Sequence, residues 1–191
     1  INASAYSRSL TLATLGGNDT LIGGSADDTF LFLADAALGT NTIKGNGGRD
    51  TVEFTGTTLG VTLDLAVHFS QPVNANLNLI LLDDLENVTG GSGNDFLYGN
   101  GLNNVLTGGL GNDWLQGRGG NETYAYNGDS IIVEHDTIVE DAGQGNDTLD
   151  FSATLNTSIS VNIAIVGAQS VTPFLTLTIQ DSGGGEAEIE N

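Results

Sequence analysis

Residues 85–126 read LENVTGGSGNDFLYGNGLNNVLTGGLGNDWLQGRGGNETYAY, and this stretch decides the fold. Cut every nine residues from residue 90, it gives four aligned lines: GGSGNDFLY, GNGLNNVLT, GGLGNDWLQ and GRGGNETYA. We number the places of each line one to nine. Glycine holds place one, a carboxylate or an amide holds place six, and leucine or tyrosine holds place eight. Nine residues are too few for a helical repeat, so the period predicts a six-residue turn followed by a three-residue strand.

A first, less regular block of the same pattern covers residues 16–54, with the lines GGNDTLI, GGSADDTFL, LGTNTIK and GNGGRDTVE. Place six is held there by Asp19, Asp28, Asn41 and Asp50, and place eight by Leu21, Phe30, Ile43 and Val52. If two lines make one coil, Asp19 lies beside Asn41 and Asp28 beside Asp50. Place eight then points inward as the core, and places seven and nine point outward.

Between the repeat blocks, apolar residues alternate with polar ones, which indicates longer half-buried strands. Residues 55–84 form such an insert, with Leu63 and Leu79 at the centres of its two runs. An irregular passage and a third repeat block follow over residues 127–151, and a second insert covers residues 152–191. We therefore expect an all-β chain: one elongated parallel β-roll, or right-handed β-solenoid, with strand inserts. The terminal EIEN matches the LEN that opens the 85–126 block, so we predict a fragment of a larger repetitive protein.

The composition favours a cation as the stabilising partner. Four Lys+Arg against 24 Asp+Glu give a formal charge of −20, which disfavours nucleic acid and anionic membranes as partners. The chain contains no cysteine, so no disulfide can staple its short strands. It has no apolar run long enough to span a membrane and no N-terminal signal peptide. We expect either export without such a signal or an internal piece of a longer chain.

The spacing of the place-six residues predicts calcium sites. Stacked coils bring like places to ~4.8 Å, where two carboxylates repel by ~0.9 kcal/mol in water and ~3.5 kcal/mol at an effective dielectric of 20. A cation between the turns replaces this repulsion with a net attraction. Carboxylates and backbone carbonyls in flexible glycine turns are hard oxygen ligands, which suit Ca²⁺ better than zinc, copper or Mg²⁺. Plain Asx turns in a solenoid, or acidity that serves solubility alone, are the alternatives.

Each pair of place-six residues on neighbouring coils is a candidate calcium site, which we call a rung. The candidate rungs differ in how well their side chains suit Ca²⁺. Asp95 with Asp113 is the strongest, Asp28 with Asp50 and Asp19 with Asn41 follow, and Asn104 with Glu122 is weaker. Asp136 and Asp147 are further candidates at irregular spacing. The full set of expected ligands is Asp19, Asp28, Asn41, Asp50, Asp95, Asn104, Asp113, Glu122, Asp136 and Asp147, with Gly91, Gly93, Gly109 and Gly111 in the ligand turns.

The lines GGSGNDFLY and GGLGNDWLQ resemble the RTX (haemolysin-type) calcium-binding repeat, GGxGxDxUx. The order of DTVEF, alternating strands, LENVTGGSGND and GNDWLQGRGGNETYAY is also similar to the C-terminal β-roll of serralysin-type metalloproteases. The resemblance implies several Ca²⁺ ions bound between turns and type I secretion from a bacterium. It also implies folding outside the cell or at its surface, next to other domains of the same chain. Asn104, Glu122 and Ala26 depart from the motif.

Two other functions stay open. A zinc protease needs an HExxH helix, but His68 and His135 are far apart and outside such a motif, and no Gly-x-Ser-x-Gly elbow occurs. We therefore expect no enzyme activity from the chain itself, although surface carboxylates could act on polysaccharides. Phe96, Trp114 and Tyr98 should project outward on one face, where they could stack on glycans or be covered by a neighbouring domain.

Overall fold

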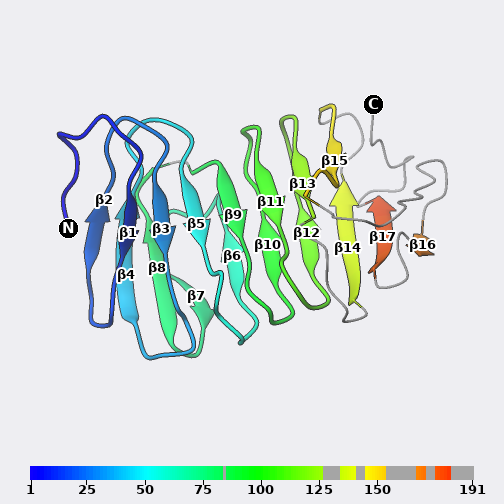
Figure 1. Ribbon diagram of the computed structural model, residues 1–191, viewed down its shortest axis with the longest axis horizontal. Helices are drawn as coiled ribbons and strands as arrows, with labels where there is room; N and C mark the ends of the chain where they lie inside the picture. The colour runs from blue at the N-terminus through cyan, green and yellow to red at the C-terminus, as the bar shows by residue number, and fades with distance from the viewer. Residues whose placement is uncertain (84, 127–133, 141–144, 154–166, 171–174, 182–191) are drawn as a thin grey trace.

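The computed structural model describes residues 1–83, 85–126, 134–140, 145–153, 167–170 and 175–181, and every regular element in this part of the chain is a β-strand. The strands stack side by side along the long axis of the molecule (Figure 1). Most of them contain three residues, as the nonapeptide period predicts. Glycine at place one and the turn residues around it end each strand before it can lengthen.

Seven strands form one wall of a roll, in the order β1-β3-β5-β9-β11-β13-β15. Their bounds are β1 Thr11–Ala13, β3 Thr29–Leu31, β5 Thr51–Glu53, β9 Asn87–Thr89, β11 Val105–Thr107, β13 Thr123–Ala125 and β15 Thr148–Asp150. All the pairings in this sheet are parallel. The chain returns to this wall at every second strand, except between β5 and β9, where three strands intervene, so two lines do make one coil.

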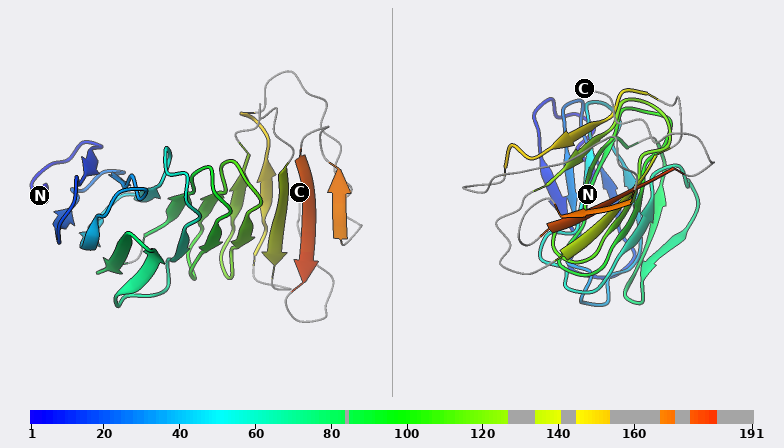
Figure 2. Two further views of the ribbon diagram at one scale, coloured as in Figure 1. Left: turned by 90° about the horizontal axis from the view of Figure 1, so that it is seen from below. Right: turned by 90° about the vertical axis from the view of Figure 1, so that its right-hand side faces the viewer.

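The alternate strands fall into two further sheets, β2-β4-β8-β7 and β16-β17-β14-β12-β10-β6. Their bounds are β2 Thr20–Ile22, β4 Gly39–Lys44, β6 Thr62–Asp64, β7 Gln71–Asn74, β8 Leu77–Leu81, β10 Phe96–Tyr98, β12 Trp114–Gln116, β14 Glu134–Glu140, β16 Gly167–Ser170 and β17 Leu175–Asp181. Antiparallel pairing occurs in β7 with β8 and in β16 with β17. Figure 2 shows the coils in a row, with β7 and β8 beside the first half of the roll.

The core is the stacked ladder of place-eight side chains. They are fully or almost fully buried and belong to one hydrophobic cluster: Leu12, Leu21, Phe30, Ile43, Val52, Leu63, Val88, Leu97, Leu106, Leu115, Tyr124 and Ile138. The insert predicted over residues 55–84 adds buried side chains from β6, β7 and β8, including Leu63 and Leu79. The fold class expected from the sequence is therefore confirmed. Of the second insert, β16 and β17 are described, and its run around residues 159–165 lies outside the described residues.

Aromatic residues fill the roll where a coil leaves the nonapeptide pattern. Phe32 and Phe54, each one residue beyond a strand, are buried with their ring centroids 6.2 Å apart. Tyr126 stacks on Phe151, with ring centroids 4.8 Å apart. In regular coils this position is place one and holds glycine, so its residue type distinguishes a tight turn from an insert.

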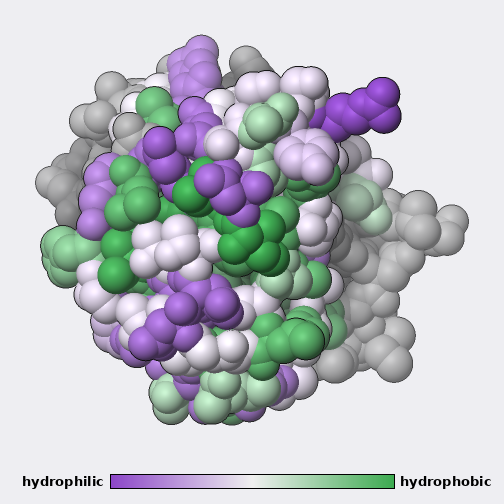
Figure 3. Space-filling view, turned by 90° about the vertical axis from the view of Figure 1, so that its left-hand side faces the viewer, coloured by the Kyte–Doolittle hydropathy of each residue, from purple (hydrophilic) through white to green (hydrophobic). Residues whose placement is uncertain are grey.

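The N-terminal end of the roll presents apolar residues among polar ones (Figure 3). Ile1, Tyr6 and Leu15 are among the exposed large apolar side chains of the first coil. The outermost strands of two sheets, β1 and β2, also lie at this end. None of the described residues belongs to a helix with the length and apolar character needed to cross a bilayer.

Candidate metal centre

The side chains at place six lie inside the roll. Asp28, Asn41, Asp50, Asp95, Asn104, Asp113, Glu122, Asp136 and Asp147 are each at most 2% exposed, whereas Asp19 is half-buried. Carboxylates are almost never this deeply buried unless hydrogen bonds or a positive charge compensate them. The positions alternate between the two walls, so the buried charges form rows that run along the roll.

A repeated hydrogen bond orders each row. Asp113 Oδ1 accepts a hydrogen bond from the backbone N–H of Asp95 in the preceding coil, at 2.8 Å. The N–H of Asp28 donates to Asp50 Oδ1 at the same distance. The equivalent bonds to Asn41, Glu86, Asp136 and Asp147 measure between 2.8 and 3.0 Å. These donors are neutral amides, so they orient the carboxylates and leave the net negative charge in place.

The second oxygen of the side chain is held by its own turn. Asp95 Oδ2 accepts from Gly91 N–H at 2.7 Å, and Asp28 Oδ2 from Gly24 N–H at 2.5 Å. The carboxylates of Asp95 and Asp28 are thus each fixed between two coils by backbone hydrogen bonds. Such preorganisation lowers the ordering cost of binding a cation.

Glycine at place one leaves space where oxygen atoms converge. A Cβ at Gly90 would lie 2.2 Å from Asp95 Oδ2 and 2.1 Å from the carbonyl oxygen of Gly108 in the next coil. A Cβ at Gly23 would lie 2.5 Å from Asp28 Oδ2 and 2.6 Å from the carbonyl oxygen of Gly45. A carboxylate oxygen of one coil and a carbonyl oxygen of the next therefore approach the same point, which a side chain at place one would fill.

Burial and mutual repulsion raise the pKa of several of these groups. Burial raises the pKa of Asp95 to about 6, against the backbone hydrogen bonds that favour its charged form. The pKa of Asp50 also rises to about 6, first through burial and then through repulsion from Glu86, Asp28 and Asp83. Burial likewise raises the pKa of Glu86. The folded chain therefore favours whatever neutralises these carboxylates, a proton or a cation.

The donor set fits calcium. The groups that converge are carboxylate and carbonyl oxygens carried by glycine turns, and Ca²⁺ takes six to eight such ligands with flexible geometry. The described residues bring no cysteine or histidine to these points, so a soft transition metal finds no preferred ligand there. When bound, the ion supplies the positive charge that the buried rows lack.

The pairs expected from the sequence are neighbours in the structure. Asp95 and Asp113, Asp28 and Asp50, and Asp19 and Asn41 are each joined by the interstrand bond described above. Asn104 and Glu122 precede the paired strands β11 and β13, and the carbonyl of Asn104 accepts from Thr123 N–H at 2.8 Å. The two irregular candidates extend these rows, Asp136 beyond Asp113 and Asp147 beyond Glu122.

The expected turn glycines also stack. The carbonyl of Gly91 accepts from Leu110 N–H at 3.0 Å. Gly109 and Gly111 have φ values of +103° and +118°, and a Cβ on them would lie 2.1 Å from Gly91 O and 2.3 Å from Gly93 O. Only glycine combines this backbone conformation with so close an approach. The turns therefore stack with their carbonyl oxygens against the bare Cα atoms of the next coil.

Two acidic residues of these rows were not among the expected ligands. Glu86 occupies place six of the coil that ends in β9, where its Oε2 accepts from Asp50 N–H at 2.8 Å. The signal was present, because Glu86 stands nine residues before Asp95 and two before the buried Val88. Asp83 accepts from the N–H groups of Gly45 and Asn46 at 2.9 Å from outside the nonapeptide pattern. No sequence period marks Asp83, since it reaches that turn from another part of the fold.

The three aromatic residues expected on one outer face differ in their surroundings. Phe96 and Trp114 are in register on β10 and β12, with Phe96 46% exposed and Trp114 half-buried. The guanidinium carbon of Arg118 lies 5.6 Å from the centre of the Tyr98 ring. The same guanidinium group forms an ion pair with Asp64 at 2.6 Å. Tyr98, which is half-buried like Trp114, therefore packs against Arg118, and Phe96 and Trp114 are neighbours on adjacent strands.

Comparison with known families agrees with this geometry. The family model described as Peptidase M10 serralysin C terminal matches residues 40–173, and the model of the RTX calcium-binding nonapeptide repeat (4 copies) matches residues 11–36. No curated protein matches the chain. The first match covers well over half of the 191 residues and includes the main repeat block. The chain therefore belongs to the family of serralysin-type C-terminal domains, and its RTX nonapeptide repeats bind Ca²⁺.

Proposed function

We propose that this chain is a structural module of a larger secreted protein and that it folds when Ca²⁺ binds outside the cell. The observation that carries the proposal is the convergence of a buried carboxylate and a next-coil carbonyl at the place-one glycines Gly90 and Gly23. In such a site the ion is part of the fold and not a substrate. Catalysis then belongs to other domains of the parent protein.

The ligands that we propose are the place-six side chains and the carbonyls of the glycine turns. The side chains are Asp19, Asp28, Asn41, Asp50, Asp95, Asn104, Asp113, Glu122, Asp136 and Asp147, with Glu86 added from the geometry. Each site held at 100 times its Kd adds ~2.7 kcal/mol, so five or six sites add ~13–16 kcal/mol. That is comparable with the whole stability of an ordinary domain, so Ca²⁺ decides whether the roll is populated.

This dependence also supports a role in export. A chain that stays unfolded at the low calcium concentration of the cytosol can pass a secretion channel, and it folds where calcium is millimolar. Type I secretion, an extracellular or cell-surface location and the division into repeat blocks and strand inserts are parts of this proposal. The family membership supports them.

A circular dichroism titration with Ca²⁺ and EGTA tests the proposal. The far-ultraviolet β signal should appear between micromolar and millimolar Ca²⁺ and disappear on chelation. Mg²⁺ at the same concentration should be a poor substitute, because it demands tighter octahedral geometry. Equal β content in EGTA and in Ca²⁺ would refute calcium-dependent folding.

A glycan-binding role is the second candidate, favoured by the neighbouring outward side chains of Phe96 and Trp114. Flat aromatic faces on adjacent strands can stack on sugar rings. Replacement of Trp114 by alanine separates binding from packing. Loss of glycan retention with unchanged calcium-dependent folding would support binding, whereas loss of stability alone would assign the strip to packing.

A further inference from the structure

Glu140 takes the position that glycine holds in the regular turns. Strand β14 pairs with β12 so that Thr137 faces Trp114 and Val139 faces Gln116. The next residue, Glu140, therefore matches Gly117 at place one. Its side chain is buried, with 0% exposure. A carboxylate thus enters the roll at a point where the other nonapeptide turns have no side chain.

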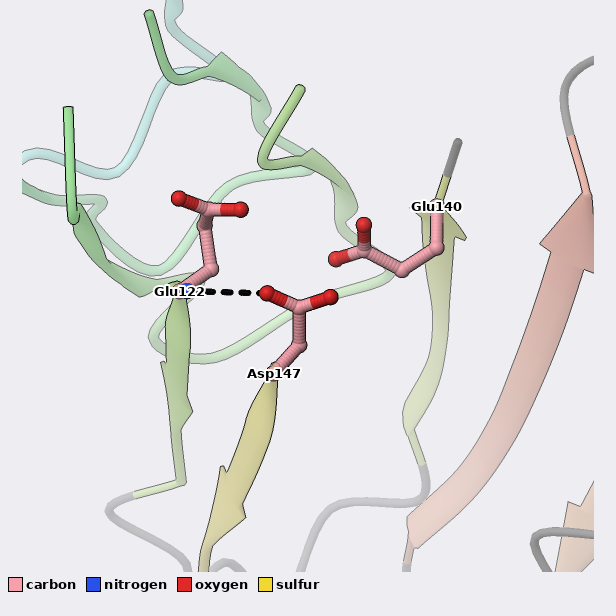
Figure 4. A group of neighbouring side chains, drawn as sticks. All are labelled: Glu122, Glu140 and Asp147. Atoms are coloured by element: carbon pink, nitrogen blue, oxygen red, sulfur yellow. Dashed lines mark hydrogen bonds between the residues drawn. The ribbon is translucent and has the colours of Figure 1, made fainter. Parts of the chain in front are cut away.

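Glu140 meets two place-six carboxylates that come from the opposite wall. One ligand oxygen each of Glu122, Glu140 and Asp147 lie within 4.8 Å of one another, and all three residues are buried (Figure 4). Glu122 precedes β13, Asp147 precedes β15, and Glu140 ends β14, which belongs to the other wall. The backbone N–H of Glu122 donates to Asp147 Oδ1 at 2.9 Å. The cluster therefore spans the interior of the roll between two sheets.

Glu122 is the residue whose charge this arrangement leaves without compensation. It is 1% exposed, and neither of its carboxylate oxygens has a hydrogen-bond partner among the described residues. Asp95, at the same place of its own coil, has both oxygens bonded to backbone N–H groups. A buried carboxylate without a partner is costly, and its burial beside two further carboxylates adds repulsion. Its carboxylate lies beside those of Glu140 and Asp147, where a cation would neutralise all three.

Tyr124 holds the carboxylate of Glu140, the third ligand, in place. Its hydroxyl donates to Glu140 Oε1 and accepts from Gly117 N–H at 2.8 Å. The other described place-eight residues of the roll are aliphatic apart from Phe30, so this hydroxyl is specific to the coil that faces Glu140. Burial and the neighbouring Glu140 carboxylate raise the pKa of Tyr124 above its ordinary value, so it stays a hydrogen-bond donor. Tyr124 is thus a positioning residue for Glu140.

We propose that Glu122, Glu140 and Asp147 form a three-carboxylate cation site inside the roll, in which the rung of Glu122 and Asp147 gains a third carboxylate from the opposite wall. This inference rests on the proposed function and extends it, because the new ligand comes from place one and joins both walls. Three hard oxygen donors with a formal charge of −3 favour Ca²⁺ over transition metals. A single ion there connects the end of β14 with the turns before β13 and β15.

The test is the number of Ca²⁺ ions bound per chain, measured by equilibrium dialysis of the full chain. Glu140→Gln and Asp147→Asn should each remove one bound ion or lower the Ca²⁺ affinity of one site. The loss of affinity should be at least as large as the roughly 10–100-fold that is typical when a residue around a metal is replaced. The double variant should also lose one ion and not two, since both residues serve the same ion. Glu53→Gln is the matched control, because Glu53 is a half-buried glutamate at place nine of β5 and should leave the count unchanged.

Circular dichroism at saturating Ca²⁺ checks that each variant is folded, and Tyr124→Phe provides a second variant that keeps all three carboxylates. It should weaken the same site by less than Glu140→Gln does. An unchanged ion count and affinity in Glu140→Gln would overturn the inference, as would a loss of two ions in the double variant. Wild-type protein that binds no Ca²⁺ at all would instead refute the proposed function, so the two failures are distinguishable.

Discussion

The rung of Asp95 and Asp113 and the rung of Glu122 and Asp147 both join place-six carboxylates of neighbouring coils, on opposite walls of the roll, but they handle buried charge differently. Around Asp95 both carboxylate oxygens accept backbone hydrogen bonds, and glycine at place one leaves room for the carbonyl of the next coil. Around Glu122 the side chain is one methylene longer, and both its oxygens lack such bonds among the described residues. A third carboxylate, from Glu140, lies close by.

The difference shows that the residue types at the places of the nonapeptide depend on one another. Aspartate at place six is short enough to reach the amide of its own turn when place one is glycine. When place one of the facing strand carries Glu140, the longer Glu122 and the hydroxyl of Tyr124 appear in the same coil. A departure from the motif at one place is therefore accompanied by departures at places that touch it in space.

The largest expected effect concerns the space at place one. Gly90→Ala should lower the free energy of unfolding in Ca²⁺ by about 3–5 kcal/mol, since the new Cβ meets the backbone carbonyl of Gly108 and removes one occupied site. Gly117→Ala should cost about 1–3 kcal/mol, because its Cβ meets side-chain atoms of Glu122 and Tyr124 that can shift. Urea unfolding at saturating Ca²⁺ measures both.

Gly101→Ala is the control for this pair, because a Cβ there meets nothing within 4 Å. It should change the stability by no more than ~0.5 kcal/mol. Equal losses in Gly90→Ala and Gly117→Ala would show that the two turns are equivalent and that the comparison fails.

Without calcium, the roll should become more stable as the pH falls. The folded-state pKa of Asp95 is about 6 and that of Glu122 about 7, both above their ordinary values through burial and, for Glu122, repulsion from Asp147. Stability from a raised carboxyl pKa is present at low pH and is lost as the pH rises through the folded pKa. For Asp95 alone the change between pH 7.5 and pH 3.5 is ~2–3 kcal/mol.

Urea unfolding in EGTA over this pH range measures the trend, and Asp95→Asn should flatten it below pH 6. The two rungs should also titrate in order, with Glu122 taking up its proton before Asp95 as the pH falls. A calcium-free chain that is most stable near pH 8 would contradict the assignment.

The smallest expected effect is a difference between Glu122 and Asp95 in the absence of calcium. Glu122→Gln removes a buried charge that has no hydrogen bond to lose, so in EGTA it should stabilise the fold by about 1 kcal/mol. Asp95→Asn turns an amide nitrogen toward a backbone N–H and should destabilise the fold by about 1–2 kcal/mol. Unfolding midpoints in urea at pH 7.5 compare them, and shifts of the same sign would remove the distinction between the rungs.

The period of nine predicts the parts of this structure that depend on local spacing. It places Leu97 and Leu115 in the core and Asp95 beside Asp113, because like places of successive coils must stack. It does not predict the β7–β8 hairpin, since both a parallel coil and a hairpin fit alternating apolar residues. Glu140 was also missed, because its role depends on the register of β14 against β12 and not on any motif. Contacts made by the longer strands thus require the three-dimensional arrangement.

The interstrand hydrogen bonds give the roll a direction. Loss of a coil therefore has different consequences at its two ends. Where this bond forms, the place-six N–H of the earlier coil donates to a side chain of the later one, as Asp28 does to Asp50 and Asp95 to Asp113. Removing a coil from the C-terminal side leaves a buried amide of the remaining coil without its acceptor. Removing one from the N-terminal side leaves a carboxylate that water can reach. The roll is a one-way stack in which each layer is completed by the layer that follows it in the sequence.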